Sequence, residues 1–281
     1  MLSVLIPTLN ERQNLADCLA SVAWADELVV VDSGSTDGTQ EIARQAGAHL
    51  VDFNWNGRLP KKKNWALENI AWKSEWVLIL DADERITLDL GAEIRAELRQ
   101  PRADGYFINR RFMFLGRWIR HCDYYPSWNL RLFRHRKGRY ENLCDGDTGS
   151  GDNEVHEHIM LKGSTTSLQK DMLHFAYPDI CTWVEKHNRY SNWEARIETG
   201  GQNGASPGEG IGSGLARRRR LREWSRRVPF RPMLRFFYSY ILKRGFLDGR
   251  EGYMFCRLLA TYEMMSVFKA YELRSSSTRK G

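Results

Sequence analysis

Glu75-Trp-Val-Leu-Ile-Leu80 is the most hydrophobic strand-like run of the sequence, and Asp81-Ala-Asp-Glu84 follows it directly. A short, continuous apolar run bounded by charged residues is typical of a strand that is buried on both faces. Such strands belong to parallel sheets that helices cover on either side. The stretch therefore predicts an α/β fold in which Asp81 and Asp83 stand at the carboxyl end of a central strand.

The preceding residues repeat this pattern. Strands are expected at Ser3–Ile6, Glu27–Asp32 and His49–Phe53, and helices lie between them. Leu15, Cys18, Leu19 and Val22 form one apolar helix face, and a third helix is expected at Trp65–Trp72. Strands and helices that alternate in this way predict a Rossmann-like, mostly parallel, doubly wound sheet.

Polar side chains follow three of these strands, at Thr8–Glu11, Asp32–Asp37 and Asp81–Glu84. In doubly wound sheets, ligands bind beyond the carboxyl ends of the strands. Two neighbouring carboxylates repel each other unless a cation lies between them, and Mg²⁺ or Mn²⁺ bound also to phosphate would supply that cation. Each cluster also has a purely structural interpretation. Asp81–Glu84 could be an exposed acidic turn, and the first two clusters could be helix caps, with Asn10 accepting from backbone N–H groups.

Asp32, Asp37 and the basic run after the third strand each allow a functional and a structural interpretation. Asp32 ends a strand and is expected to bind a nucleobase or ribose, whereas Asp37 is as consistent with a cap as with a site. One lysine of Lys61-Lys-Lys63 is expected to reach a diphosphate, and the other two are expected to be solvated.

The composition narrows the class of protein. A hydrophobic content of 42% and an aromatic content of 12% argue against general disorder. Five scattered cysteines suggest neither a disulfide framework nor a zinc site, and a reducing compartment follows as the default. The net charge is +7, but nine Arg and one Glu give Arg217–Arg235 a charge of +8 on its own. The basicity is therefore local and points to one anionic partner surface.

The sequence resembles family 2 glycosyltransferases of GT-A fold. The motifs that carry this resemblance are Ser3-Val-Leu-Ile-Pro-Thr-Leu-Asn-Glu11, Val31-Asp-Ser-Gly-Ser-Thr-Asp-Gly-Thr39, Lys63-Asn-Trp-Ala-Leu67 and Leu80-Asp-Ala-Asp-Glu84. The later motifs are similar to those of the bacterial branch that builds lipopolysaccharide core and exopolysaccharide; they are Arg131-Leu-Phe-Arg134, Val155-His-Glu157, His187-Asn-Arg-Tyr-Ser191 and Gly245-Phe-Leu-Asp-Gly249.

The resemblance implies an inverting, metal-dependent transfer of a sugar from a nucleotide-sugar, expected to be a UDP-sugar. It implies that Thr8, Glu11 and Asp32 contact the nucleoside, that Lys63 lies near the donor, and that Asp83 binds Mg²⁺ or Mn²⁺. Asp81 would lie against the ribose or the diphosphate. Residues 1–100 would form the nucleotide-sugar-binding half of a GT-A domain and residues 101–165 its acceptor-binding half.

An inverting transfer needs a carboxylate to take the proton of the acceptor hydroxyl. The cluster Glu154, His156, Glu157, His158 offers one, and the resemblance favours Glu157; Glu154, Asp147 and Asp152 stay open as alternatives. His156 is expected at the metal or the diphosphate, or else as a polar surface residue. Arg131 and Glu154 are candidates for contact with the acceptor or a phosphate.

Residues 166–281 are expected to form a helical, Arg-rich, membrane-proximal extension with a flexible loop at 200–214, where seven Gly occur. The arginines of Arg217–Arg235 and the aromatic residues after them suit an anionic membrane surface, and the implied acceptors are lipid-linked. We therefore expect a cytoplasmic protein held peripherally at the inner face of the membrane. Alternatively, Arg217–Arg235 is a run of charges that is simply exposed to solvent.

Two other functions compete. A sugar-1-phosphate nucleotidyltransferase would need a Gly-rich loop after the first strand, where Pro7-Thr-Leu-Asn10 stands instead. A nucleic-acid-binding protein would use the basic segment and its aromatic residues, but this leaves the ordered acidic clusters unexplained. No nucleic-acid partner is expected.

Overall fold

A computed structural model of the chain describes residues 1–141, 158–199 and 230–278. Its elements divide into two compact units. Unit 1 comprises Met1–Arg111 and Ser127–Phe175, and unit 2 comprises Phe112–Pro126 and Ala176–Gly281. Two strands, β6 (Gly105–Phe114) and β11 (Thr165–Tyr177), contribute residues to both units.

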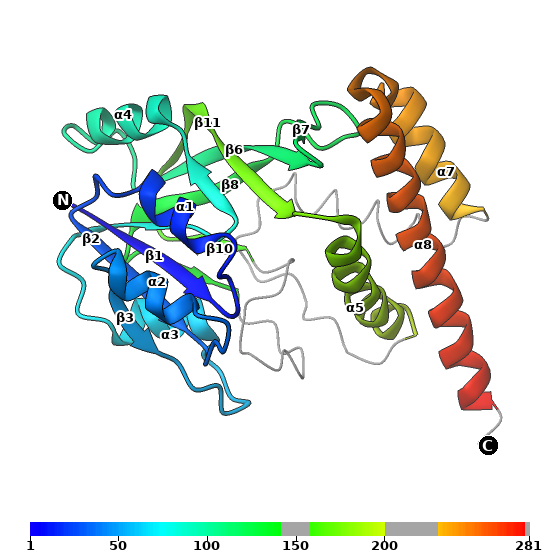
Figure 1. The fold of residues 1–281 in the computed structure, drawn as a ribbon, viewed down its shortest axis with the longest axis horizontal. Helices are drawn as coiled ribbons and strands as arrows, with labels where there is room; N and C mark the ends of the chain where they lie inside the picture. Colours follow the sequence, from blue (N-terminus) through cyan, green and yellow to red (C-terminus); the bar gives the residue numbers. More distant parts are fainter. Residues whose placement is uncertain (142–157, 200–229, 279–281) are drawn as a thin grey trace. The chain divides into compact units, whose positions relative to one another are not determined.

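Unit 1 begins with four parallel strands in the order β3, β2, β1, β4 (Figure 1). These strands are β1 (Leu2–Thr8), β2 (Glu27–Asp32), β3 (His49–Asp52) and β4 (Trp76–Ile79). The helices α1 (Leu15–Ser21), α2 (Thr39–Gln45) and α3 (Lys62–Asn69) connect them in turn. The α/β alternation that the sequence predicted is therefore confirmed, although α3 begins and ends three residues earlier than expected.

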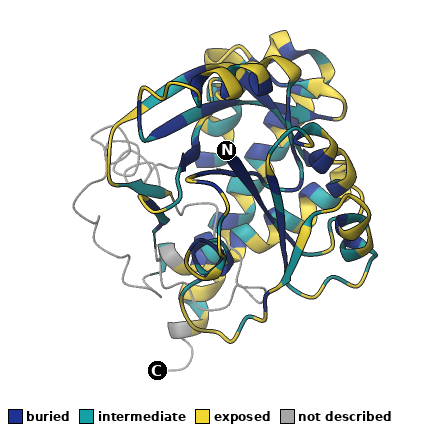
Figure 2. Cartoon of the chain, turned by 90° about the vertical axis from the view of Figure 1, so that its left-hand side faces the viewer, coloured by how far each residue is buried: buried dark blue, intermediate teal, exposed yellow. Residues whose placement is uncertain are grey.

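The sheet is wound on both faces. Alternate residues of β1 separate two cores, because Val4 and Ile6 pack with α1, α2 and α4 (Leu88–Glu97), whereas Leu5 packs with α3. Figure 2 shows the central strands as buried, and Val4, Leu5 and Ile6 are completely excluded from solvent. This is the pattern of strands in a parallel sheet that helices cover on both sides.

Beyond β4 the sheet changes direction. β8 (Trp128–Arg134) pairs antiparallel with β4 and with β6, and the order continues through β11 to β5 (Glu84–Ile86). The sheet is therefore mixed, with its parallel half at the N-terminal end of the chain. β9 (Gly138–Tyr140) and β10 (Ile159–Leu161) form a separate antiparallel pair.

Unit 2 is mainly helical. Its elements are β7 (Arg117–Trp118), α5 (Ile180–Glu198), α7 (Arg231–Phe237), the π-helix η1 (Tyr238–Leu242), the 3₁₀-helix η2 (Gly245–Asp248) and α8 (Gly249–Thr278). Phe112, Phe114, Trp183 and Phe255 form the centre of its core. The expected helical region begins later than residue 166, because β11 extends as a strand to Tyr177.

The Gly245-Phe-Leu-Asp-Gly249 motif forms the junction between η2 and α8. A Cβ on Gly252 would lie 2.3 Å from the carbonyl oxygen of Gly245, so the first turn of α8 can pack on η2 only with glycine at position 252. Asp248 is buried and accepts from the backbone N–H of His121 at 2.8 Å. The motif is therefore explained by close packing within unit 2.

One arginine of the expected membrane-binding segment proves to be internal. Arg231 is buried, and its guanidinium pairs with Glu198 at 3.3 Å and with Glu263 at 2.5 Å. It therefore joins α7 to α5 and α8 and is not available to a membrane, contrary to the expectation. Arg217–Arg227 and the 200–214 loop lie outside the described residues.

Candidate functional site

The carboxyl ends of the parallel strands bring four polar residues into one row. The pairing register places Thr8 opposite Asp32 and Asp32 opposite Asp52, while Asp81 follows the end of β4 after Leu80. Because the strands are parallel, all of these side chains lie at the same edge of the sheet. The expected convergence of the strand ends is thus present in the fold.

Asp32 organises the loop that follows β2. It is buried and accepts hydrogen bonds from Thr8 Oγ1 at 2.9 Å, from the backbone N–H of Ser35 at 2.8 Å and from Gln40 Nε2 at 2.8 Å. Burial acts to raise the pKa of Asp32, but the hydrogen bonds from Ser35 and Gln40 outweigh it and lower the pKa below its ordinary value. Asp32 is therefore an ionised residue that fixes the shape of the loop.

The loop after β1 is fastened to the loop after β2. Asn10 Oδ1 accepts from the backbone N–H of Thr36 at 2.9 Å, and the N–H of Glu11 donates to Thr39 Oγ1 at 2.8 Å. Asn10 has a left-handed φ of 57°, which asparagine tolerates better than most residues. The alternative that Asn10 caps the first helix is wrong, because its side chain binds the neighbouring loop instead.

Asp37 has a local structural role. Its Oδ2 accepts from the backbone N–H of Arg12 at 3.0 Å, and its Oδ1 accepts from that of Thr39, also at 3.0 Å. These contacts favour the capping interpretation of this residue, which the sequence left open. They also bring the start of α2 and the loop after β1 together around Asp32.

Asp81 lies between two cations. Lys63 Nζ is 2.7 Å from Asp81 Oδ1, and Arg131 Nη2 is 2.7 Å from Asp81 Oδ2. Burial acts to raise the pKa of Asp81, but the charges of Arg131 and Lys63 outweigh it and hold the pKa well below the ordinary value. Asp81 is therefore a carboxylate at any physiological pH, and Lys63 reaches it from the first turn of α3.

Arg131 and Glu84 support Asp81 from within the protein. Glu84 is fully buried, accepts from Arg131 Nη2 at 2.6 Å and accepts from the backbone N–H of Asp81 at 3.0 Å. Arg110 Nη1 lies 3.5 Å from the same carboxylate. The guanidinium of Arg131 thus binds two carboxylates, and its expected contact with an acceptor or a phosphate stays a prediction.

The other two lysines of the basic run are not solvated, so that expectation is wrong. Lys61 and Lys62 are both buried, and Lys62 Nζ donates to the carbonyl oxygen of Thr8 at 2.9 Å. Lys62 therefore ties the beginning of α3 to the end of β1. Lys63, which the sequence singled out, is the lysine that reaches the acidic strand end.

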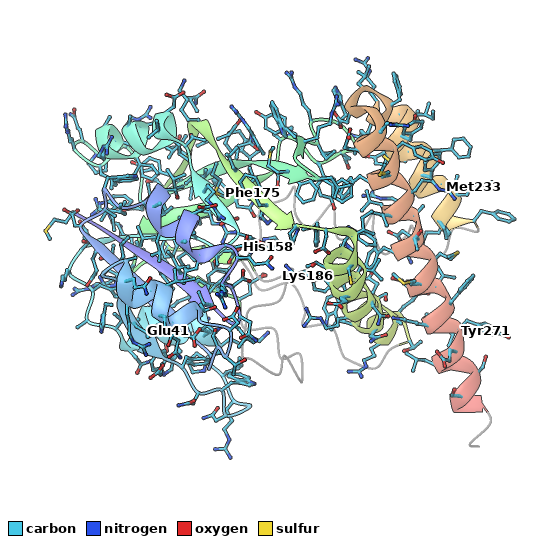
Figure 3. The ribbon with its side chains drawn as sticks, viewed as in Figure 1. Glu41, His158, Phe175, Lys186, Met233 and Tyr271 are labelled. Atoms are coloured by element: carbon cyan, nitrogen blue, oxygen red, sulfur yellow. The ribbon has the colours of Figure 1, made fainter. Side chains whose placement is uncertain are left out.

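Asp83 lies beside a histidine that the sequence did not indicate. His174 Nε2 is 3.6 Å from Asp83 Oδ1, and both side chains are largely shielded from solvent. The backbone explains the approach, since β11 pairs with β5 and the N–H of Phe175 donates to the carbonyl oxygen of Asp83 at 2.8 Å. Figure 3 labels Phe175, whose ring lies under the guanidinium of Arg85 at 5.5 Å.

Several expected site residues cannot be placed. Glu154, His156 and Glu157 lie outside the described residues, as do the alternatives Asp147 and Asp152. Among the residues that the structure does describe, no three His, Cys, Asp or Glu side chains gather closely enough to hold a metal ion. Asp83 and His174 are thus a pair of candidate ligands and do not form a complete metal centre.

The sequence did not indicate the structural roles of Glu84, Arg110 and His174. Glu84 was visible as the residue after the Asp81-Ala-Asp83 motif, but nothing local showed that it is buried. His174 and Arg110 are far from the motif in sequence and come to it only through the antiparallel half of the sheet. Their signal is long-range pairing, which a single sequence does not display.

Comparison with known proteins gives a consistent assignment. The model of the family described as glycosyl transferase family 2 matches residues 3–151. The lipopolysaccharide core biosynthesis glycosyltransferase LpsC of Rhizobium meliloti (strain 1021) is 27% identical over 291 residues, which cover 99% of this chain and 94% of that protein.

Two other matches are weaker, the first because it covers less of both chains and the second because its identity and TM-score are low. A TPR repeat-containing protein of Synechococcus elongatus is 38% identical over 129 residues, which cover 45% of this chain but only 30% of that protein. Among solved structures, residues 1–349 of TarS from S. aureus give a TM-score of 0.44 at 15% identity, covering 100% of this chain and 92% of that one.

The family match includes every strand of the parallel half of the sheet and the three polar strand ends that Thr8, Asp32 and Asp81 mark. The mixed α/β sheet is the GT-A type of fold that the motifs implied. Since the match covers just over half of the 281 residues, the chain belongs to glycosyl transferase family 2.

Proposed function

We propose that this glycosyltransferase moves a sugar, with inversion, from a UDP-sugar to a lipid-linked, lipopolysaccharide or exopolysaccharide acceptor. One observation carries the proposal: the segment after β4 holds two separate carboxylates in two different settings. Asp81 is paired with Lys63 and Arg131, whereas Asp83 lies beside His174. Asp81 and Asp83 would therefore contact different parts of a nucleoside diphosphate.

The donor is proposed to lie along the row of strand ends. Thr8, Glu11 and Asp32 lie at the two joined loops and would contact the nucleoside. Asp32 would also hold the loop after β2 in place. Lys63 is largely shielded from solvent and stands at the first turn of α3, where its charge would favour a diphosphate. Asp81 would lie against the ribose or the diphosphate.

Asp83 and His174 fit a divalent cation. Metal–oxygen and metal–nitrogen bonds of about 2.1 Å place two adjacent ligands roughly 3 to 3.5 Å apart. The observed 3.6 Å between Oδ1 and Nε2 meets this requirement with little movement. Mg²⁺ and Mn²⁺ usually take few protein ligands and complete their shell with phosphate and water. When bound, such a cation would offset the charge of the departing diphosphate.

The acceptor side rests on residues that the sequence alone identifies. Inversion in one displacement needs a base on the acceptor hydroxyl, and Glu157 is the proposed base, with Glu154 as the alternative. His156 is a further proposed contact of the metal or diphosphate. The full-length similarity to a protein named for lipopolysaccharide core biosynthesis supports a saccharide acceptor of this class. We also propose a cytoplasmic location, peripheral at the inner face of the membrane.

Donor hydrolysis tests the assignment directly. The purified chain is incubated with UDP-, GDP- and dTDP-sugars and Mn²⁺, and slow release of the nucleoside diphosphate is measured for wild type, Asp83→Ala and the surface control Asp89→Ala. We expect turnover of a UDP-sugar that Asp83→Ala loses and Asp89→Ala retains. If no donor binds or turns over, or if Asp83→Ala is as active as wild type, the proposal is wrong.

Two further experiments test the role of His174 at the metal and the identity of the base. Calorimetric titration of Mn²⁺ in the presence of UDP should show weaker metal binding for His174→Gln than for wild type, and unchanged binding for Asp89→Asn. Between Glu157→Gln and Glu154→Gln, the variant that keeps donor binding but loses transfer identifies the base. Unchanged Mn²⁺ affinity in His174→Gln would remove this residue from the metal site.

A further inference from the structure

Unit 2 carries an unusual concentration of exposed apolar side chains. Ten of them fall within residues 230–254, whereas the whole described part of unit 1 has four, at Met1, Leu59, Leu88 and Trp128. The ten are Phe230, Met233, Leu234, Phe237, Ile241, Leu242, Phe246, Leu247, Tyr253 and Met254. We refer to these ten residues as the docking surface. A contiguous apolar area on a folded protein usually marks an interaction site.

The helix α7 shows that this exposure follows a pattern. Phe230, Met233, Phe237 and Ile241 recur at helical spacing, so they form one outward stripe along α7 and η1. Other sides of the helix are already occupied, because Phe236 packs against Tyr253 with ring centroids 6.0 Å apart and the buried Arg231 pairs with Glu263. Figure 1 shows α7 alongside the first half of α8, and Figure 3 labels Met233 on it. The stripe is thus not needed for the packing of unit 2.

Basic residues outnumber acidic ones around the docking surface, since residues 230–257 contain six cationic and two acidic side chains. Two of the cations are engaged within the protein, because Arg231 is buried in ion pairs and Lys243 lies 2.8 Å from Asp123. Both acids are engaged, since Asp248 binds His121 at 2.7 Å and Glu251 lies 3.6 Å from Arg117. Arg244 and Arg250 are exposed, and neither has a carboxylate partner among the described residues. The partner of this surface should therefore be both apolar and anionic.

An open pocket of about 430 Å³ lies within this region. Tyr240, Phe246, Gly249, Arg250, Tyr253 and Met254 line it. It thus combines three aromatic rings and a methionine with one guanidinium. Aromatic rings and arginine side chains are the groups that settle at the boundary between lipid headgroups and acyl chains.

We propose that the docking surface binds the face of a bilayer that contains anionic phospholipids, with the apolar stripe of α7 and η1 in the interfacial region and Arg244 and Arg250 at the phosphates. No described helix has the length and hydropathy needed to cross a bilayer, so the contact is with one leaflet. This contact rests on the peripheral membrane location of the proposed function, and it lies on a folded surface in place of the arginines before Phe230.

Other occupants fit the observations less well. A second copy of the chain, related by two-fold symmetry, would bring the cationic rims of both copies together. A nucleic acid would use the cations and the rings, but methionine, leucine and isoleucine offer bases no stacking platform. An anionic bilayer satisfies both the apolar stripe and the positive rim.

Vesicle sedimentation with the full chain tests the proposal. Wild type is mixed, without donor, with vesicles of phosphatidylcholine alone or with about one third phosphatidylglycerol. The stripe variant is Met233→Ser with Phe237→Ser, and its matched control is Ile180→Ser with Val184→Ser, an exposed i, i+4 pair on α5. The charge variant is Arg244→Gln with Arg250→Gln, and its control is Arg99→Gln with Arg189→Gln.

We expect wild type to bind the phosphatidylglycerol vesicles and both controls to match it. Each basic residue near an anionic leaflet contributes about fivefold to the partition coefficient, so the charge variant should bind roughly 25-fold more weakly at low salt. The stripe variant should lose about tenfold or more. Circular dichroism and thermal unfolding verify that each variant is folded.

Four outcomes would overturn the proposal. Wild type could fail to bind anionic vesicles, or the stripe and charge variants could bind as well as their controls. A chain lacking residues 205–227 could lose all vesicle binding while both surface variants keep it, which would assign the contact to the basic segment instead. Light scattering that shows a dimer dissociated by the stripe substitutions, with vesicle binding intact, would make this surface an interface between copies. Because no donor is present, failure here leaves the glycosyl-transfer proposal untouched.

Discussion

Replacing Arg131 with methionine removes the cation on which the acidic strand end depends. One nitrogen of Arg131, Nη2, donates to Asp81 at 2.7 Å and to Glu84 at 2.6 Å. Methionine keeps most of the volume of the side chain and its apolar stem, so the substitution isolates the loss of charge and of the two hydrogen bonds. The fully buried Glu84 would keep Arg110 at 3.5 Å, and Asp81 would keep Lys63 at 2.7 Å.

The expected loss of stability depends on the cations that remain beside Asp81 and Glu84. Removing one partner of a buried ion pair typically costs 3 to 5 kcal/mol, because a buried charge is left uncompensated. Since Arg110 and Lys63 still offset part of that charge, we expect Arg131→Met to lower the free energy of unfolding by about 3 kcal/mol. Arg134→Met, on the same strand, is the matched control. Arg134 pairs with the exposed Glu75, lies over Trp76 and is 3.2 Å from Asp104. Because Asp104 would keep Lys137 at 2.7 Å, we expect a loss of only about 1 kcal/mol.

Urea unfolding of wild type and of both variants, followed by circular dichroism, measures these differences. The pH dependence gives an independent check on Asp81. Its folded-state pKa is lowered, so its charge stabilises the fold above the unfolded pKa of about 4, and that contribution is lost as the pH falls through the folded value. The gap between wild type and Arg131→Met should therefore narrow below pH 4. If Arg131→Met is no less stable than Arg134→Met, the reasoning is refuted.

Three further predictions concern Lys63, Gly252 and His187. Lys63→Met should weaken UDP-sugar binding about tenfold in calorimetry while Lys63→Arg largely retains it, because the cation is what matters; equal affinities for both would contradict the assigned role. Gly252→Ala should lower the melting temperature, since the new Cβ would meet the Gly245 carbonyl, whereas helix propensity alone predicts a gain of about 1 kcal/mol. Burial lowers the pKa of His187 to about 4, so the unfolded chain binds more protons between pH 6.5 and 4 and stability should fall by about 3 kcal/mol across that window. His187→Gln should flatten this slope, and an unaltered slope would show that another group causes it.

The parallel half of the sheet was predictable because its signals are local. β1, β2 and β4 are short apolar runs, and a helix follows each of β1, β2 and β3 in the chain. Asp32 and Asp81 could therefore be placed at strand ends from the sequence alone. The partners of these two residues could not all be predicted. Arg131 is 50 residues away from Asp81 in the sequence and contacts it only because β4 pairs with β8.

The antiparallel half illustrates the opposite case. β5 has three residues and follows the Asp81-Ala-Asp83 motif so closely that the pattern resembles a loop. β11 has thirteen residues, but its buried and exposed positions do not alternate regularly. His174 lies on this strand without any motif around it, and its place beside Asp83 depends on the register between β11 and β5. The burial of Lys61 and Lys62 was not predicted for a related reason. Three adjacent lysines look solvated in a sequence, and the bond from Lys62 Nζ to the carbonyl oxygen of Thr8 appears only in the structure.

The two strands that pass from one unit to the other make unit 2 discontinuous in the chain, since it is assembled from residues 112–126 and from residues after 175. During synthesis, Phe112 and Phe114 leave the ribosome about 140 residues before Phe255, on which both rings pack. Unit 2 therefore cannot complete its core until the beginning of α8 has been translated. A recombinant fragment cut at the limits of the family match would carry these two phenylalanines without their partner, so it would expose apolar surface that the full chain buries.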